Sequence, residues 1–262
     1  MVEPIRFASG LDLISGDYIA IGMWVKLPLL ESIEIAELAG FDFVVIDLEH
    51  STISVETAAR QVALARACGV APLVRVPLSA RAEVGRILDA GAAGVIFPSV
   101  SSVSEAEEAV SLCRFPPVGN RGAGPTSRAG RWGLDSLVDY LAKGRSNLLV
   151  IGQIESSEAA RNVGAIAAVK GIDALLVGQT DLAVSMGATA GDVAVREVVT
   201  SVERSASAAQ VPLGTAFGSA DGIDLDLVSR GYKFAVVSND VTMLASAAVG
   251  TASEARARLS VQ

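Results

Sequence analysis

The 262-residue sequence has few of the residues that most often reveal a function. It contains one histidine, His50, so any catalysis by an imidazole depends on that residue. Its two cysteines, Cys68 and Cys113, form no CxxC pair, and we expect two buried free thiols in a reducing cytoplasm. No apolar stretch approaches the roughly 20 residues of a membrane span, and the start of the chain lacks the apolar segment of a secretory signal. These absences favour a cytoplasmic protein with no membrane partner.

Charge and composition exclude further classes of protein. The net charge of −8 argues against nucleic acid or an anionic membrane as a partner. The sequence has no GxGxxG or Walker A motif, which argues against a nucleotide-binding open sheet. Hydrophobic residues make up 51% of the chain and aromatic residues only 5%, so the core is mainly aliphatic. This composition is typical of parallel strands covered by alanine-rich helices.

Short apolar runs alternate with helical patterns along the chain. The expected strands are 18–25, 42–48, 72–76, 94–98, 148–154, 174–178, 212–217 and 234–238. The expected helices are 31–39, 54–68, 80–89, 103–112, 156–168, 192–209, 219–230 and 240–258. Ser54 and Ser104 are expected helix caps, and left-handed glycines are expected at Gly40, Gly69, Gly91, Gly171 and Gly231. The pattern predicts one α/β domain, residues 1–262, folded as a (β/α)8 TIM barrel; a doubly wound open sheet is the alternative.

The longest stretch between expected strands contains an insertion, 115–132, which includes Arg121 and Trp132. Because it follows a helix, we expect it to lie away from the mouth of its own barrel. Two interpretations remain open for the loop from Arg121 to Trp132. It is structural, or it reaches the site of a neighbouring subunit.

Candidate site residues gather at the carboxyl ends of the expected strands, where barrels carry their chemistry. In chain order they are Trp24, Lys26, Asp47, Glu49, His50, Arg75, Gln153, Glu155, Gly178, Thr180 and Asp181. Glu155 and Asp181 end adjacent strands, where two carboxylates repel each other unless a cation lies between them. Two carboxylates with open water positions suit Mg²⁺ or Mn²⁺. The alternative is that each carboxylate caps the helix that follows it.

Arg75 and His50 are further candidates for chemistry. Arg75 alternates with apolar residues on a central strand, so its burial requires either a carboxylate partner or an anionic substrate. A structural ion pair with Asp47 or Glu49 is the first of these alternatives. Asp47 is also close enough in sequence to His50 to orient the imidazole and raise its basicity. A solvated histidine at a capped strand end is the simpler interpretation of His50.

Six strings carry a resemblance to a known family. They are GFDFVVIDLEH, PLVRVP, GAAGVIFPSVSSVSEAEEAV, RFPPVGNRGAG, QIES and VGQTDLAVSMG. From about Gly22 to Ser246 the sequence resembles the class II pyruvate aldolases of the HpcH/HpaI type. The resemblance implies a barrel like the phosphoenolpyruvate/pyruvate domains, assembled as a hexamer (a trimer of dimers) with exchanged C-terminal helices. It also implies metal-dependent, reversible cleavage of a 4-hydroxy-2-oxo acid to pyruvate and an aldehyde.

The resemblance also implies roles for the candidate residues. Glu155 and Asp181 would bind a divalent metal, Mg²⁺ or Mn²⁺ with Co²⁺ as a further alternative, and the 2-oxo acid would chelate it. Arg75 would stabilise the enolate at the keto oxygen, and His50, oriented by Asp47, would govern proton transfer. The substrate carboxylate would be framed by Trp24, Gln153 and the backbone around Gly178, Thr180 and Asp181, and Glu49 would contact metal-bound water.

The sequence departs from the family pattern in three places. Lys26 stands where better-known members have a small residue, and it would contact an acidic acceptor, pair with Glu49 or, in a Schiff-base mechanism, react itself. Gln179-Thr180 replaces Pro-Ala or Pro-Ser, and the short segment 187–192 replaces a longer one with Asn, Pro and His. Acceptor choice is the property that these changes affect. A citrate-synthase-like or oxaloacetate-decarboxylating enzyme, and a non-catalytic barrel, are the alternative functions.

Overall fold

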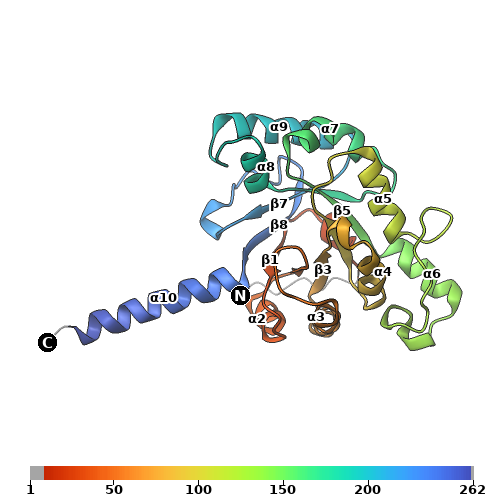
Figure 1. Ribbon diagram of the computed structural model, residues 1–262, viewed down its shortest axis with the longest axis horizontal. Coiled ribbons are helices and arrows are strands. Elements are labelled where there is room, and N and C mark those ends of the chain that lie inside the picture. The colour runs from red at the N-terminus through yellow and green to blue at the C-terminus, as the bar shows by residue number, and fades with distance from the viewer. Residues whose placement is uncertain (1–8, 261–262) are drawn as a thin grey trace.

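The computed structural model describes residues 9–260, in which eight parallel strands close into a barrel (Figure 1). The strands are β1 (Ala20–Val25), β2 (Phe43–Asp47), β3 (Ala71–Arg75), β4 (Gly94–Phe97), β5 (Leu149–Ile154), β6 (Ala174–Val177), β7 (Leu213–Phe217) and β8 (Tyr232–Asn239). Each strand pairs with its neighbours in sequence, and β8 pairs with β1. The expected TIM barrel is therefore confirmed, with each expected strand on an observed one. The expectation of no secretory signal concerns the first residues of the chain, and most of these lie outside the described residues.

Helices cover the outside of the barrel, and most lie where the sequence predicts them (Figure 1). They are α1 (Asp12–Ser15), α2 (Glu31–Ala39), α3 (Val55–Cys68), α4 (Ala82–Asp89), α5 (Val103–Cys113), α6 (Leu137–Ser146), α7 (Ser157–Ala167), α8 (Gln179–Ser185), α9 (Val193–Ala208) and α10 (Asp240–Leu259), with short 3₁₀ turns η1 (Leu78–Ala80), η2 (Arg128–Gly133) and η3 (Ala220–Gly222). The sequence reading missed α1, α6 and α8.

The helix expected at 219–230 is wrong. Only η3 and turns occupy the connection between β7 and β8. Leu225 is 93% exposed while Leu227 is buried, so the apolar residues form no stripe that a helix would bury. The Asp224 carboxylate instead accepts the backbone N–H of Asp226 at 3.0 Å, which holds a turn.

Helix ends follow the expected chemistry with one correction. Ser54 caps α3 as expected, because its hydroxyl accepts the backbone N–H of Thr57. The cap of α5 is Ser102 and not Ser104: Ser102 and Glu105 form a capping box, whereas Ser104 lies inside the first turn. The five glycines expected to be left-handed have φ between 81° and 107°, as predicted.

Two phenylalanines belong to the cluster of buried side chains that fills the interior of the barrel. Phe43 of β2 and Phe234 of β8 meet edge to face, with ring centroids 6.1 Å apart. Each ring occupies the space beside a glycine, since a Cβ on Gly22 would lie 2.4 Å from the Phe43 ring and one on Gly214 would lie 2.1 Å from the Phe234 ring. Because this filling closes the barrel from inside, the open space is left at its mouth.

The expectations about buried cysteines and about membrane spans can both be compared with the structure. Cys113 is buried as expected, and burial raises the pKa of its thiol to about 12. Cys68 is only half-buried, which corrects the expectation of two buried thiols, because it lies in the last turn of α3. Among the described residues, no helix is long and apolar enough to cross a membrane.

The insertion lies away from the barrel mouth, as expected. Its η2 turn packs against α4, and the Arg128 side chain lies against Gly91, which precedes β4 at the opposite end of the barrel. The Arg128 guanidinium stacks over Trp132 at 5.5 Å, and Trp132 is 67% exposed. The segment is therefore anchored on the outer surface with an exposed aromatic side chain.

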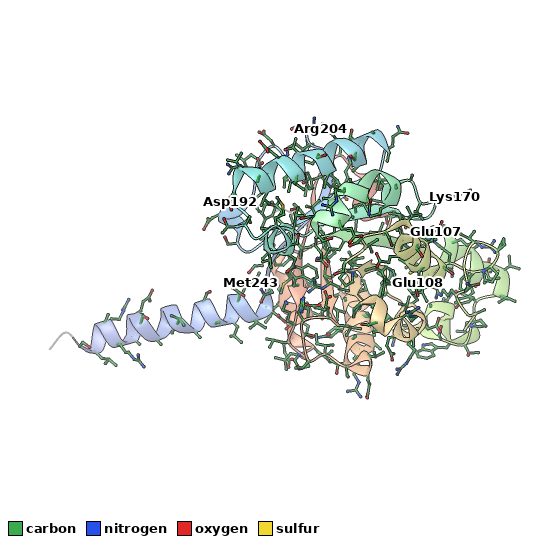
Figure 2. The ribbon with its side chains drawn as sticks, turned by 45° about the horizontal axis from the view of Figure 1, so that its top comes forward. Glu107, Glu108, Lys170, Asp192, Arg204 and Met243 are labelled. Atoms are coloured by element: carbon green, nitrogen blue, oxygen red, sulfur yellow. The ribbon has the colours of Figure 1, made fainter. Side chains whose placement is uncertain are left out.

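The last helix, α10, extends away from the barrel (Figure 1). Of the strands, only β1 and β8 contact it substantially, and every described residue after Asp240 in this helix is exposed. Figure 2 shows Met243 where the helix leaves the barrel. Among the described residues this long helix stays exposed beyond Asp240, and that exposure is the feature that bears on assembly.

Candidate active site

The carboxyl ends of the strands surround a cavity of about 410 Å³, here called the mouth cavity. Its lining residues are Trp24, Lys26, His50, Arg75, Gln153, Gly178, Gln179, Thr180, Asp181, Ala216, Phe217, Gly218, Ser238 and Asn239. All the candidate residues of the sequence line it except Asp47, Glu49 and Glu155, which contact lining residues or lie beside them. The alignment of parallel strand ends therefore brings the predicted set together.

Asp47 and Arg75 form a buried ion pair on one side of the mouth cavity. The two residues face each other on β2 and β3, and the guanidinium donates from Nε at 2.9 Å and from Nη2 at 2.7 Å. Nη1 lies 3.2 Å from Oε2 of Glu49, and the guanidinium stacks on Trp24 at 4.3 Å. The structural ion pair considered for Arg75 is thus present. Asp47 and Glu49 accept only some of the N–H groups of the Arg75 guanidinium, so the others remain as donors for a ligand in the cavity.

The charge of Asp47 is maintained by its neighbours. Burial raises the pKa of this carboxyl, but the hydrogen bonds and charge of Arg75 outweigh burial and, together with the Glu49 amide and Lys26, lower the pKa to about 2. Asp47 is 0% exposed. The carboxylate is therefore ionised at any physiological pH and acts as the counter-ion of Arg75.

Lys26 also pairs with Asp47, with Nζ 3.1 Å from Oδ2. The alternative pair with Glu49 is not the one formed. The backbone at Lys26 is fixed by Asp240 at the start of α10, whose carboxylate accepts the N–H groups of Lys26 and Leu27 at 2.9 and 3.1 Å. The ammonium thus has a defined place in the mouth cavity.

His50 differs from expectation in its partner. Asp47 contacts it only through the backbone, accepting the His50 N–H at 3.3 Å, because Arg75 and Lys26 occupy the carboxylate. The imidazole Nε2 lies 3.7 Å from Oε2 of Glu49, and the side chain is 60% exposed. Burial raises the pKa of Glu49, and the negative charge of Glu155 raises it further, against the opposing effects of Arg75 and His50. Glu49 therefore takes the place expected for Asp47 beside the imidazole.

Glu155 is held rigidly on the other side of the mouth. Its Oε1 accepts the backbone N–H and the hydroxyl of Ser99, each at 2.7 Å, and Gln153 donates to its Oε2. Gly178 allows this approach, since a Cβ there would lie 3.2 Å from Oε2. The buried Oε1 of Gln153 has no hydrogen-bond partner among the described residues. Glu155 is thus fixed in position, and the amide oxygen of its neighbour Gln153 is left without a hydrogen-bond partner among the described residues.

Asp181 completes the polar set from the first turn of α8. It lines the mouth cavity, is exposed, and makes no side-chain hydrogen bond or ion pair with the described residues. No group of three or more His, Cys, Asp or Glu side chains in residues 9–260 is arranged to hold a metal. Two carboxylates are therefore the most that this part of the chain offers a cation, and water or a ligand must supply the rest.

The sequence reading missed several residues of the site. Ser99 follows β4 with φ of 55°, and nothing in the sequence marks a serine that donates twice to a carboxylate. Phe217 and Gly218 at the end of β7 also line the mouth. Gln179 appeared only as a departure from the family pattern, yet its amide donates to Thr215 at 3.3 Å and lines the cavity. For Phe217, Gly218 and Gln179, a position at or just after the end of a strand was the available signal.

This closed barrel, with a guanidinium, an imidazole and two carboxylates around its mouth, defines a TIM-barrel enzyme whose site suits a small anion. Residues 20–247 match the family described as HpcH/HpaI aldolase/citrate lyase, and the chain belongs to that family. It is an enzyme of the class II pyruvate aldolase type. The resemblance carried by the six sequence strings is confirmed.

Individual relatives agree with this assignment. A 5-keto-4-deoxy-D-glucarate aldolase of Escherichia coli O139:H28 is 37% identical over 186 residues, which cover 71% of each chain. An HpcH/HpaI aldolase from Desulfitobacterium hafniense DCB-2 superposes with a TM-score of 0.86 at 28% identity, covering 98% of both chains. The citrate synthase SbnG also gives a TM-score of 0.86, at 25% identity, covering 95% of this chain and 98% of its own.

Proposed function

We propose that the protein is a divalent-metal-dependent aldolase that reversibly cleaves a 4-hydroxy-2-oxo acid to pyruvate, or a related 2-oxo acid, and an aldehyde. The observation that carries this proposal is that a guanidinium and a pair of carboxylates lie on opposite sides of the mouth cavity. Arg75 has donors left for an oxo-acid oxygen on one side, and Glu155 and Asp181 lie on the other. The 5-keto-4-deoxy-D-glucarate aldolase relative supports an acid of this general class.

The residues present fit a metal ion. Glu155 has one oxygen fixed by Ser99, while its second oxygen lies beside Gly178 and accepts a hydrogen bond from the Gln153 amide nitrogen. The Asp181 side chain makes no hydrogen bond or ion pair with the described residues and lines the cavity. Glu155 and Asp181 would hold Mg²⁺ or Mn²⁺, with Co²⁺ as a further alternative. When bound, such an ion polarises the carbonyl of the oxo acid and stabilises negative charge on its oxygen.

Cleavage breaks the bond between C3 and C4 of the substrate. The 4-hydroxyl loses its proton as the aldehyde forms, the electron pair of the bond passes into the enolate of pyruvate, and the enolate then takes a proton at C3. Arg75, stacked on Trp24 and fixed by Asp47, donates to the oxygen on which charge develops. His50, beside Glu49, holds and returns the proton. Gln153 and the backbone around Gly178 and Thr180 frame the carboxylate of the oxo acid.

The proposal is tested by pyruvate release from a panel of 4-hydroxy-2-oxo acids, before and after EDTA and then with Mg²⁺ or Mn²⁺ added. We expect EDTA to abolish the activity and metal to restore it. Glu155→Gln and Asp181→Asn should each lower kcat/KM by about 100-fold or more and weaken Mn²⁺ binding in calorimetry. The matched control is Glu107→Gln, an exposed carboxylate on α5 that does not line the mouth cavity (Figure 2). Activity that EDTA leaves intact would refute the metal mechanism and direct attention to Lys26 and borohydride trapping.

A second candidate is an enzyme acting on oxaloacetate, either decarboxylating it or joining it in a citrate-synthase-like reaction. The observation that favours it is Lys26, an additional cation lining the mouth cavity, together with the similarity to SbnG. A more anionic substrate suits this cation. Loss of oxaloacetate that exceeds aldol cleavage in wild type, and that falls in Lys26→Met, would support this candidate over the aldolase.

We also propose that α10 exchanges with a neighbouring subunit of a homo-oligomer, a hexamer built as a trimer of dimers. The single barrel domain would then end in a helix that packs on a neighbouring subunit and not on its own barrel. The full exposure of α10 beyond Asp240, with apolar side chains such as Leu244 at 61% and Val249 at 68%, supports this arrangement.

A further inference from the structure

Asp240, the first residue of α10, has a buried carboxylate that accepts hydrogen bonds from three parts of the chain. Its partners are the backbone N–H groups of Lys26 and Leu27, at 2.9 and 3.1 Å, and the hydroxyl of Ser32 on α2, at 2.9 Å. The backbone N–H of Val241 on α10 itself also donates to it, at 2.9 Å. Asp240 is only 8% exposed, and all four donors are uncharged. Such a carboxylate is stable in a buried place because these hydrogen bonds replace its lost water.

The end of β1 depends on this carboxylate because the sheet does not extend that far. Strand β1 ends one residue before Lys26, its pairing with β8 shifts register, and the last pair is Trp24 with Asn239. The N–H groups of Lys26 and Leu27 lie beyond this pairing, and the Asp240 side chain accepts both of them. Asp240 therefore fixes the backbone from which the Lys26 side chain starts.

The Lys26 side chain is fixed at its other end by Asp47. Its Nζ lies 3.1 Å from Oδ2 of Asp47, and the same oxygen accepts Nη2 of Arg75 at 2.7 Å. Lysine carries its charge on a flexible carbon stem, so the ammonium keeps one place only when backbone and charge partner are both held. Because the two cations share one oxygen, movement of Lys26 changes the charge beside Arg75. Both cations line the mouth cavity.

We propose that Asp240 is a positioning residue of the mouth cavity: it fixes the end of β1 and so holds the Lys26 ammonium on Asp47, beside Arg75. The inference rests on the proposed aldolase function and adds to it a residue that does not itself line the cavity. Because Asp240 is the first residue of α10, the helix proposed to pack on a neighbouring subunit also acts on the site of its own barrel.

The segment after β1 has a second anchor, which makes Asp240 accessible to mutation. Gln61 of α3 is fully buried, and its Nε2 donates to the carbonyl oxygens of Leu27 and Leu29 at 2.9 and 3.0 Å. Asp240→Asn should therefore fold, since Gln61 still holds the segment and the new side chain has the same size. The amide keeps one acceptor oxygen and its NH₂ group cannot accept, so the end of β1 loses part of its support.

The position of the Lys26 ammonium can be measured without turnover. The chain has only four lysines, which are Lys26, Lys143, Lys170 and Lys233. Reductive methylation with ¹³C-labelled formaldehyde therefore gives a simple NMR spectrum, in which Lys26→Met assigns the signal of Lys26. In Asp240→Asn we expect this signal to move toward that of a freely solvated lysine while the other lysine signals stay in place. A Lys26 signal that does not move would overturn the proposal.

Ser32→Ala is the matched control. It removes one donor from the Asp240 carboxylate but leaves the N–H groups of Lys26 and Leu27 bonded to it. We expect a lower urea midpoint with an unchanged Lys26 signal and an unchanged kcat/KM. A Lys26 signal that moves as far in Ser32→Ala as in Asp240→Asn would refute a specific role in holding the end of β1.

A double-mutant cycle tests the effect on the reaction, with pyruvate release from a 4-hydroxy-2-oxo acid as the assay. Asp240→Asn should lower kcat/KM about ten-fold, because the charge beside Arg75 is no longer held in place. In the Lys26→Met background the same change should cost less than about two-fold, since the group that Asp240 positions is already absent. Equal effects in the two backgrounds, including no effect in either, would overturn the proposal.

The lysine spectrum separates this inference from the proposed function. A Lys26 signal that depends on Asp240, in a wild-type protein that releases no pyruvate from any oxo acid, would refute the aldolase and keep the positioning of Lys26. Metal-dependent pyruvate release with no dependence of the Lys26 signal on Asp240 would keep the aldolase and refute the positioning role.

Discussion

The ion pair of Asp47 with Arg75 shows how single residues determine the site. Arg75 would be costly to bury alone, and Asp47 supplies two hydrogen bonds on the neighbouring strand. The pair fixes the guanidinium in the plane that Trp24 covers, so its free donors point into the mouth cavity. Asp47 is therefore a positioning residue, which acts on the substrate through Arg75 and through Lys26, with which it also pairs.

Asp47→Asn should destabilise the protein by about 3 kcal/mol at neutral pH, because it leaves Arg75 with half of its partner. The pKa of Asp47 in the folded protein, about 2, lies below the usual aspartate value of 3.8, so the ionised carboxylate stabilises the fold above pH 3.8. That contribution, about 2 kcal/mol, disappears as the pH falls toward 2. Urea unfolding between pH 5 and 3 should therefore show a steeper loss of stability in wild type than in Asp47→Asn.

The exposed Asp221→Asn serves as the control for this series and should follow wild type. Parallel pH profiles for wild type and Asp47→Asn would contradict the assignment of the low pKa to this pair.

The sequence predicted which residues belong to the site better than it predicted which of them contact one another. Strand periodicity was enough to place Arg75, Gln153 and Asp181 at the mouth, since parallel strands end at one edge. It was not enough to decide which cation Asp47 meets, because that choice depends on side-chain directions across β1, β2 and β3. His50 consequently has Glu49 as its neighbour and not Asp47.

Among the elements, α5 offers a direct test of helix capping. Ser102→Ala should lower the free energy of unfolding by about 1 kcal/mol, because the N–H of Glu105 loses its acceptor and the capping box is broken. Ser104→Ala, two residues along, removes an exposed hydroxyl inside the helix and should change stability by less than about 0.5 kcal/mol. Urea denaturation of both variants measures the difference. A larger effect at Ser104 would move the cap back to the position expected from the sequence.

Helices and strands were predictable where the spacing of apolar residues and the residues at the ends indicate the same element. They were not predictable where these two signals disagree. All eight strands were found because each is a short aliphatic run between polar turns. The connection after β7 misled the prediction because its alternating Asp and Leu residues offer enough apolar side chains for a helix but not on one face. α8 was missed because it begins directly after β6, with Gly178 as its cap and no preceding loop.

For the whole molecule, α10 is the decisive element. Its smaller and apolar side chains recur at helical spacing along one side, at Val241, Leu244, Ala248, Ala252, Ala255 and Leu259. Leu244→Glu should break the proposed assembly into smaller species, because a charge would have to be buried at the subunit contact. Ser246→Glu, on the opposite side of the helix, is the control and should leave the assembly intact. Sedimentation velocity gives the masses; a wild-type monomer, or equal masses for both variants, would refute helix exchange.

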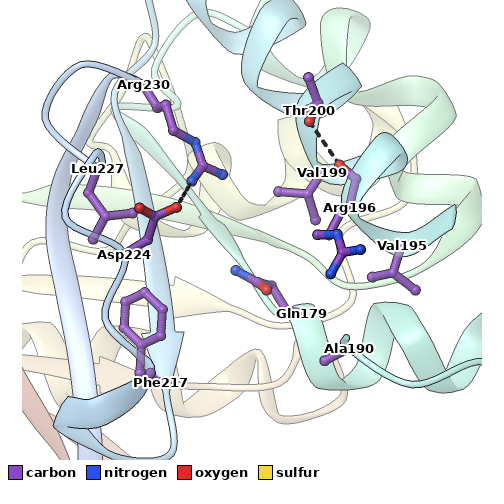
Figure 3. Close-up of a pocket in the computed structure, with 11 residues that line it drawn as sticks. Gln179, Ala190, Val195, Arg196, Val199, Thr200, Phe217, Asp224, Leu227 and Arg230 are labelled. Carbon is purple, nitrogen blue, oxygen red and sulfur yellow. Dashed lines mark hydrogen bonds and ion pairs between the residues drawn. The ribbon is translucent and has the colours of Figure 1, made fainter. Parts of the chain in front are cut away.

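The irregular connection between β7 and β8 has a consequence for how such an enzyme diversifies. The groups proposed to carry the reaction are attached to β2, β3, β5 and the start of α8, whereas this connection and α9 line a separate cavity of about 400 Å³ next to the mouth cavity (Figure 3). Segments without a regular hydrogen-bonded frame tolerate substitution and changes of length more readily than strands do. The surroundings of the mouth can therefore change by substitution in this connection while the groups proposed to carry the reaction keep their places on the strands.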